Sequence, residues 1–113
     1  MRFLVFAGST LIGWSHLEQG DAPMGVALGR FFPSNAYVSS IHAAGRAALR
    51  VSPEGSTVSL EPSGGVHITD YSADLGPDGI EISVLGIASD SYERFFPEHV
   101  RAYAEQFPPR EAP

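Results

Sequence analysis

The chain has 113 residues, 43% of them hydrophobic and 18% charged, which is the composition of one compact domain rather than of a disordered segment. It contains no cysteine and no lysine, which excludes a disulfide framework, a thiolate metal site and lysine Schiff-base chemistry. Residues 1–50 hold four arginines against two acids, whereas residues 51–113 hold three arginines against eleven acids. An acidic half repels phosphate backbones and attracts basic proteins, so we expect no nucleic-acid binding and favour a basic protein partner.

The first strand is predicted over residues 2–8, where the letters RFLVFAG form a continuous apolar run of the kind that is covered on both faces. Gly8 and Ser9 interrupt this run, and it lacks a convincing A-x-A cleavage site, so we interpret it as a strand rather than a signal peptide. No stretch reaches the roughly 18 apolar residues that a membrane-spanning helix needs. We therefore expect a cytoplasmic protein without a membrane partner.

Residues 11–18, with the letters LIGWSHLE, should pair with the first strand as a hairpin. Their alternation predicts two faces, one with Ile12, Trp14 and His16 and the other with Leu11, Ser15 and Leu17. A third strand is predicted over residues 24–32, in which Gly25 and Gly29 indicate a bulge or a close approach of another backbone.

A short helix is predicted over residues 34–44, because Ser34 or Asn35 can cap its first turn and Gly45 can end it. Three turns that combine proline and glycine follow, with the letters SPEG, EPSGG and GPDG. Four segments around these turns have strand patterns and are expected to form an antiparallel meander: residues 47–51, 57–61, 66–71 and 79–87.

The last element is predicted as a helix over residues 97–107. Pro97 suits the first helical position, and Glu98 in the first turn interacts favourably with the helix dipole. Four residues follow the helical spacing and should form one buried stripe: Val100, Tyr103, Ala104 and Phe107. Two prolines end the helix, and residues 108–113 are expected to be a frayed tail.

These elements predict an α+β fold in a single domain over residues 1–113. We expect one antiparallel sheet of six or seven strands, strongly twisted or partly closed, with the first strand in its middle. One short central helix and the C-terminal helix should pack on this sheet. The predicted core consists of Phe3, Val5, Trp14, Val26, Phe31, Ile41, Ile68, Ile82, Val84 and Tyr103.

The letters RFFP occur twice, at residues 30–33 and 94–97, each time before a predicted helix. The first copy completes a strand, whereas the second follows the polar letters SDSYE. Because these contexts differ and nothing else matches at that spacing, we interpret the copies as aromatic staples that pin helix starts to the core. An internal duplication is the alternative.

Residues with recognisable site chemistry are few. The four histidines lie in four different elements without metal-ligand spacing, so we predict no metal site and no cofactor. The letters GST and SGG lack the setting of a nucleophile elbow, so no catalytic residue is assigned and a non-enzymatic role is favoured. Four acids around one turn lack the spacing of an EF-hand and fit a solvated, self-repelling loop, a patch for a basic partner or adventitious calcium binding: Asp70, Asp74, Asp78 and Glu81.

Trp14 is the only tryptophan and is interpreted as a core residue or as an interface anchor. The stretch from residue 13 to residue 37 carries the pattern L-E-x-x-D-x-P-M-G-V-A-x-G and resembles small bacterial proteins of unknown function. The resemblance implies no activity. Within it, Glu18 and Asp21 flank a turn and can bond to its amides or to Arg30.

Three functions remain open. The leading one is a non-catalytic protein-binding module, similar to an immunity protein or antitoxin, that uses the four acids and Trp14 against a basic partner. The second is a small-molecule-binding protein or enzyme with a pocket between sheet and helix, lined by Tyr37, His67 and Tyr71. The third is a structural module that pairs, for example as a homodimer, through Trp14 and an exposed strand edge.

Overall fold

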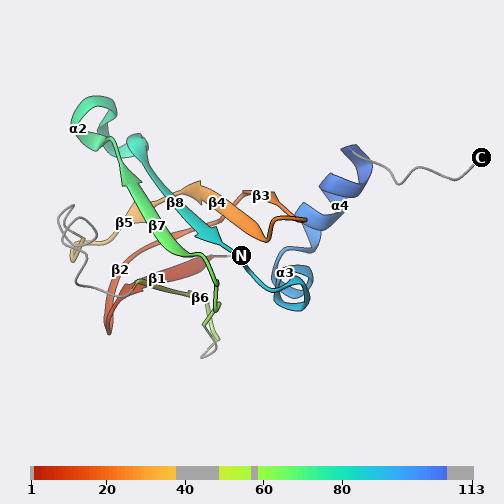
Figure 1. Cartoon of the computed structure of the whole chain (residues 1–113). Helices are drawn as coiled ribbons and strands as arrows, with labels where there is room; N and C mark the ends of the chain where they lie inside the picture. Colours follow the sequence, from red (N-terminus) through yellow and green to blue (C-terminus); the bar gives the residue numbers. More distant parts are fainter. Residues whose placement is uncertain (1, 38–48, 57–58, 107–113) are drawn as a thin grey trace, which may run out of the picture.

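The computed structural model describes residues 2–37, 49–56 and 59–106 (Figure 1). In this part of the chain the fold is α+β, as predicted, and contains two antiparallel sheets of four strands each. The first sheet has the order β5-β2-β1-β6, formed by Phe32–Pro33, Thr10–Ser15, Phe3–Ala7 and Leu49–Pro53. The second has the order β3-β4-β8-β7, formed by Gln19–Asp21, Val26–Arg30, Ile80–Leu85 and Gly65–Asp70.

The expectation of a single sheet of six or seven strands is therefore wrong, because the chain changes sheet three times, at two tight corners and again between β6 and β7. Leu17 lies at the first corner, between β2 and β3, and has a φ of 45°. Phe31 lies at the second, where the predicted strand 24–32 divides into β4 of one sheet and β5 of the other. Both side chains are buried, so each corner points an apolar residue into the shared core.

The first two strands form the predicted hairpin, with β1 between β2 and β6 in the middle of its sheet. A bulge changes the predicted faces of β2: Val5 pairs with Gly13 and Phe6 with Leu11, which leaves Ile12 as the extra residue. Ile12 is buried, whereas Trp14 is half-buried and contacts exposed His16. The prediction that Ile12 shares a face with Trp14 is thus wrong.

The inner faces of both sheets contribute to one hydrophobic core. Six of the predicted core residues are buried: Phe3, Val5, Phe31, Ile68, Ile82 and Val84. Trp14 and Val26 are only half-buried, and Ile41 lies outside the described residues. Tyr103 is 39% exposed, so its assignment to the core is wrong.

The C-terminal helix α4 (Pro97–Gln106) has the predicted position, but it points away from the sheets (Figure 1). Only its first turns reach the core, through Val100, while Tyr103 and Ala104 remain exposed. The helix α3 (Ser89–Phe95) was not predicted, because its polar sequence has no continuous apolar stripe. The chain also forms a short helix α2 (Ser72–Leu75) and a 3₁₀ turn η1 (Gly76–Gly79) at the opposite end, where the sequence predicted a turn.

Two further predicted elements fall partly on residues that the structure does not describe. The central helix predicted over residues 34–44 lies outside the described residues from position 38 onward. Of the strand predicted over residues 57–61, the described part is not a strand, although the Leu60 amide donates a hydrogen bond to the Val51 carbonyl at 2.8 Å. Among the described residues, no helix has the length and apolar character to cross a membrane.

The two RFFP copies place their phenylalanines differently. In the first copy Phe31 is buried at a corner and Phe32 stacks on Trp14. In the second, Phe95 is half-buried and Phe96 is buried immediately before α4. Phe96 therefore pins the start of α4 to the core, as the staple interpretation expects for this copy.

Tyr92 of α3 gives the fold a pH dependence at alkaline pH. Its side chain is buried, and its hydroxyl donates a hydrogen bond to the Val26 carbonyl at 2.9 Å. Burial, and secondly the charge of Asp21, raise the pKa of Tyr92 from 10.0 to about 12. Because the folded state holds this proton more tightly than the unfolded chain, the resulting stabilisation is complete below pH 10 and is lost as pH rises through about 12.

We therefore expect the free energy of unfolding to fall between pH 10 and about 12, with a shallower fall in Tyr92→Phe. Urea titrations at several pH values measure this slope, and tyrosinate absorbance follows the ionisation itself. Equal slopes in the two proteins would show that Tyr92 ionises normally.

Candidate functional site

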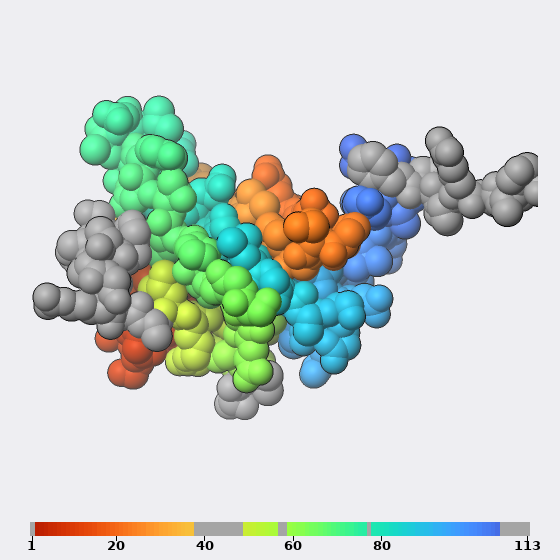
Figure 2. Space-filling view, in the orientation of Figure 1, coloured from red at the N-terminus to blue at the C-terminus, as the bar shows by residue number. Residues whose placement is uncertain are grey.

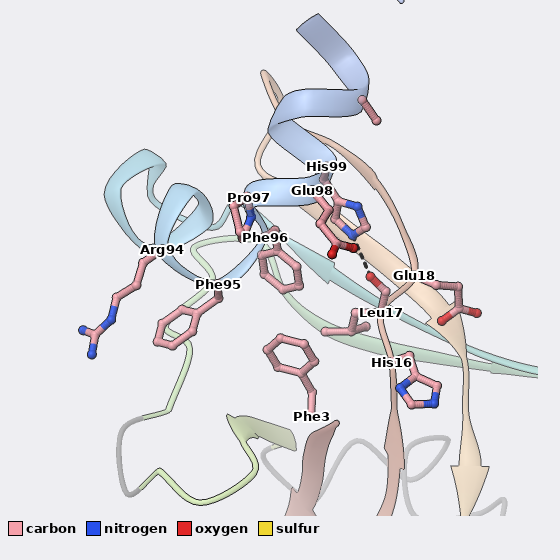
Figure 3. A pocket seen from close by; sticks show the side chains of 11 residues that line it. Phe3, His16, Leu17, Glu18, Arg94, Phe95, Phe96, Pro97, Glu98 and His99 are labelled. Carbon is pink, nitrogen blue, oxygen red and sulfur yellow. Dashed lines mark hydrogen bonds between the residues drawn. The ribbon is translucent and has the colours of Figure 1, made fainter. Parts of the chain in front are cut away.

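A cleft of about 570 Å³ lies at the end of the sheets where α3 and α4 are found. Apolar side chains form its floor, among them Phe3, Leu17, Phe95 and Phe96. Figure 3 shows His16 and Glu18 on one side of this floor and Glu98 and His99 on the other, projecting from α4. We call these eight residues, together with Arg94 and Ala102, the α4 cleft.

Three rings form a continuous stack beneath the α4 cleft. Phe3 and Phe96 are stacked with centroids 5.0 Å apart, and Phe96 and His99 are stacked with centroids 5.3 Å apart and planes 6° from parallel. Tyr92 packs against Phe96 from α3, at 5.0 Å. These rings come from β1, α3 and the first turn of α4, so the stack holds the three walls of the cleft together.

The Leu17 corner supports the cleft from the side of the sheets. The Leu17 amide donates a hydrogen bond to Ser15 Oγ at 3.0 Å, which accommodates the left-handed backbone of this residue. Its carbonyl oxygen lies 2.7 Å from His99 Nε2, and the two atoms are joined by the dashed line in Figure 3. Because a carbonyl only accepts, Nε2 carries the hydrogen, which assigns the tautomer of neutral His99.

Glu18 is held in place by the neighbouring strand β4. Its Oε1 accepts a hydrogen bond from the Arg30 backbone amide at 2.9 Å. Its carboxylate lies against Gly29, where an added Cβ atom would displace it. Asp21 Oδ1 likewise accepts from the Met24 amide at 3.3 Å. The predicted contact of Glu18 with Arg30 is confirmed, but the residues between Glu18 and Asp21 form β3 rather than the predicted turn.

Charge is arranged unevenly around the α4 cleft. The carboxylates of Glu18 and Glu98 and the guanidinium of Arg94 give a net charge of −1 while both histidines are neutral. Arg94 Cζ lies 5.1 Å from the centre of the Phe95 ring. In Figure 3 the guanidinium extends away from the other labelled polar groups, and Glu18 lies on the opposite side of the aromatic rings. The carboxylate side of the cleft therefore favours positive charge.

The four acids of the predicted patch have different surroundings. Asp70 is engaged within the fold: its Oδ2 accepts from the Tyr37 hydroxyl at 2.6 Å and its Oδ1 from the Ser72 amide at 2.8 Å. Asp78 forms an ion pair with Arg30. The remaining two acids, Asp74 and Glu81, are exposed. The structure thus leaves three acids exposed near α2, whereas half-buried Asp70 is held by hydrogen bonds to Tyr37 and Ser72.

The predicted ligand-binding residues Tyr37, His67 and Tyr71 do not line the α4 cleft. Tyr37 packs on Phe31 with ring centroids 5.3 Å apart, and burial, followed by the hydrogen bond to Asp70, raises its pKa. His67 is exposed on β7, with Nε2 2.9 Å from the Gly64 carbonyl. Tyr71 is exposed and lines a second, smaller cavity of about 330 Å³, together with Leu75, Asp78 and Glu81.

Trp14 lies on the outer face of the first sheet rather than in the core. Its ring stacks on Phe32 with centroids 4.2 Å apart, and the Arg2 guanidinium lies 5.3 Å from its centre. The side chain is half-buried by these neighbours. This position is compatible with the predicted role as an interface anchor and excludes a role in the central core.

In the described residues, no group of three or more histidines and acids is placed to hold a metal ion. Comparison with protein-family models, with curated proteins and with solved structures gives no match to this chain. The resemblance of residues 13–37 to small bacterial proteins therefore stays a prediction, and the chemistry of the α4 cleft is the basis for assigning a function.

Proposed function

We propose that this protein binds a small ligand with an apolar body in the α4 cleft. The observation that supports this is the cleft itself, about 570 Å³ in volume, with apolar side chains in its floor and polar side chains on both sides. Small-molecule sites have volumes of this order and the same combination of apolar walls with a few placed polar groups. The proposal keeps the predicted location, between sheet and helix, and replaces the predicted lining.

The test uses a bulky residue to fill the cleft without touching the core. Ala102 is exposed on α4 and lines the cleft, so Ala102→Phe should block it. Ala104 is exposed on the same helix outside the cleft lining, so Ala104→Phe is the matched control. We expect 2-phenylethanol, 2-phenylethylamine or 3-phenylpropionate to bind the wild type in saturation-transfer NMR. Binding should be lost in Ala102→Phe and kept in Ala104→Phe, and equal binding by both variants would contradict the proposal.

The second candidate function is binding of a basic protein partner at the α2 end of the molecule. Figure 2 shows this segment standing out from the body at the end opposite α4. Two large apolar side chains are exposed there, Tyr71 at 58% and Leu75 at 68%. They adjoin the exposed acids of the predicted patch, so an apolar anchor with a charged rim is available.

Neutralising the exposed acids should slow association with such a partner. Replacing Asp74, Asp78 and Glu81 by Asn or Gln removes charges that act mainly through steering, and salt should slow the wild type toward the variant. The variant should fold normally because the pair of Asp78 with Arg30 is at the surface. Biosensor association rates at low and high salt, with a partner captured from the native host, measure this effect. An on-rate unchanged by both treatments would refute the patch and favour pairing through Trp14, the structural alternative.

A further inference from the structure

We propose that the ligand of the α4 cleft is a monocation with an aromatic or alkyl body, of the class of arylalkyl amines. This inference rests on the proposed function and adds the chemical class of the ligand. It is based on three properties of the cleft: its carboxylates, its aromatic rings and the positions of its hydrogen-bond donors.

The carboxylates of Glu18 and Glu98 lie on opposite walls of the cleft, one at the Leu17 corner and one in the first turn of α4. One carboxylate oxygen of Glu18 accepts a hydrogen bond from a backbone amide. Glu18 forms no ion pair with any described side chain. Glu98 likewise forms no ion pair within the described part of the chain. A cation in the cleft would therefore be attracted by two carboxylates that no described cation neutralises, that of Glu98 on α4 and that of Glu18, whose oxygens lie over β4 against Gly29 and the Arg30 amide.

The aromatic floor favours the same charge. The faces of phenylalanine rings carry negative electrostatic potential and attract cations within about 6 Å. Arg94 already lies over the Phe95 ring in this way, at 5.1 Å, so the floor accommodates a cation in the structure itself. The body of the ligand can pack against half-buried Phe95 and exposed Ala102, because Phe3 and Phe96 are covered by their own stack.

The donors of the cleft are poorly placed for an anion. His99 donates its Nε2 hydrogen to the Leu17 carbonyl, so this group is occupied within the fold. The Arg94 guanidinium points away from the carboxylates in Figure 3. An anion lying on the Phe96 side would meet the charges of Glu18 and Glu98 without a facing cation, which disfavours carboxylate ligands.

The experiment compares three probes of similar size that differ in charge: 2-phenylethylamine, 2-phenylethanol and 3-phenylpropionate. We expect the amine to bind about tenfold more tightly than the alcohol, because two carboxylates act on one charge, and the propionate to bind most weakly. Titrations followed by two-dimensional NMR of the protein give the dissociation constants. Raising the salt concentration should weaken amine binding and leave alcohol binding unchanged.

Charge-neutralising variants assign the effect to the two carboxylates. Glu98→Gln and Glu18→Gln should each weaken amine binding by about two- to fivefold and leave the alcohol unchanged. Glu105→Gln is the matched control, since Glu105 is exposed on the same helix and does not line the cleft. Circular dichroism confirms that each variant is folded.

The possible outcomes separate this inference from the proposed function. If the alcohol or the propionate binds as tightly as the amine, the cleft binds ligands but the inferred charge class is wrong. If the amine binds tightly and both glutamine variants leave it unchanged, the assignment to Glu18 and Glu98 is wrong. If none of the three probes binds at the cleft, both the proposed function and this inference are overturned.

Discussion

Replacing Ile82 by alanine should lower the free energy of unfolding by about 2–5 kcal/mol, the range measured for truncating large aliphatic residues in protein cores. Ile82 has no exposed surface and lies in β8, between β4 and β7. Its register neighbours are Gly29 and Ile68, so the side chain packs beside a glycine that cannot fill the space left by truncation. The cavity should therefore persist, which places the expected loss well above that of a surface change.

Ser83→Ala is the matched control, because Ser83 is the next residue of β8 and is only half-buried. It should change the stability by less than about 0.5 kcal/mol. Urea unfolding of the two variants, followed by circular dichroism, measures both values. A loss below about 1 kcal/mol for Ile82→Ala would show that β8 does not occupy the centre of its sheet.

The elements that were predicted well are those whose signal is local. The hairpin of β1 and β2 follows from an apolar run interrupted at Gly8, which has a φ of 62° in the turn. The strand β7 and the strand β8 follow from alternation between turn signals, and α4 follows from Pro97 at its start. In each case the information lies within about ten neighbouring residues.

The arrangement of these strands could not be predicted, because it depends on two corners with no local signature. A leucine with a φ of 45° is unusual, and nothing in the letters around Leu17 marks it. The residues on both sides of Phe31 are mostly apolar, so they have the pattern of one strand. In the structure they form β4 and β5, which belong to different sheets. The bulge at Ile12 likewise keeps an alternating pattern while exchanging the faces.

The α4 cleft was missed for a related reason. Its residues come from β1, from the Leu17 corner and from the two C-terminal helices, so only tertiary packing brings them together. The sequence gives His16 and Glu18 two positions apart and Glu98 and His99 side by side. Those spacings match no site motif. The one feature that could have pointed to the cleft is that a histidine lies close to a glutamate in both places.

The four acids of the predicted patch show that residues close in sequence can have different surroundings in the fold. Asp70 is close in sequence to the other acids, and its proximity to the turn suggested a shared surface. In the structure its two carboxylate oxygens accept hydrogen bonds from Tyr37 and from the Ser72 amide. Sequence spacing identified the exposed acids, but it could not distinguish them from one that the fold uses internally.

Phe96→Ala should both lower the free energy of unfolding and loosen α4, which forms one wall of the α4 cleft. Phe96 is buried and contacts three rings, those of Phe3, Tyr92 and His99. Truncating a buried phenylalanine typically costs about 3–5 kcal/mol, and here it also removes the residue that joins α3 to α4. We therefore expect a loss of this size in urea unfolding and faster hydrogen exchange at the amides of α4 than in the wild type.

Phe95→Ala is the matched control, because it also removes an aromatic ring from the cleft but leaves the contacts of Phe96 in place. Phe95 also lines the cleft but is half-buried, so its truncation should cost roughly 1–2 kcal/mol, in proportion to the smaller apolar area removed from water. It should leave exchange in α4 near the wild-type rate, because the contacts of Phe96 with Phe3 and His99 remain. Equal losses in the two variants, or unchanged α4 exchange in a folded Phe96→Ala protein, would mean that the ring stack does not hold α4. In that case the wall of the cleft formed by α4 would depend chiefly on the hydrogen bond between His99 and the Leu17 carbonyl.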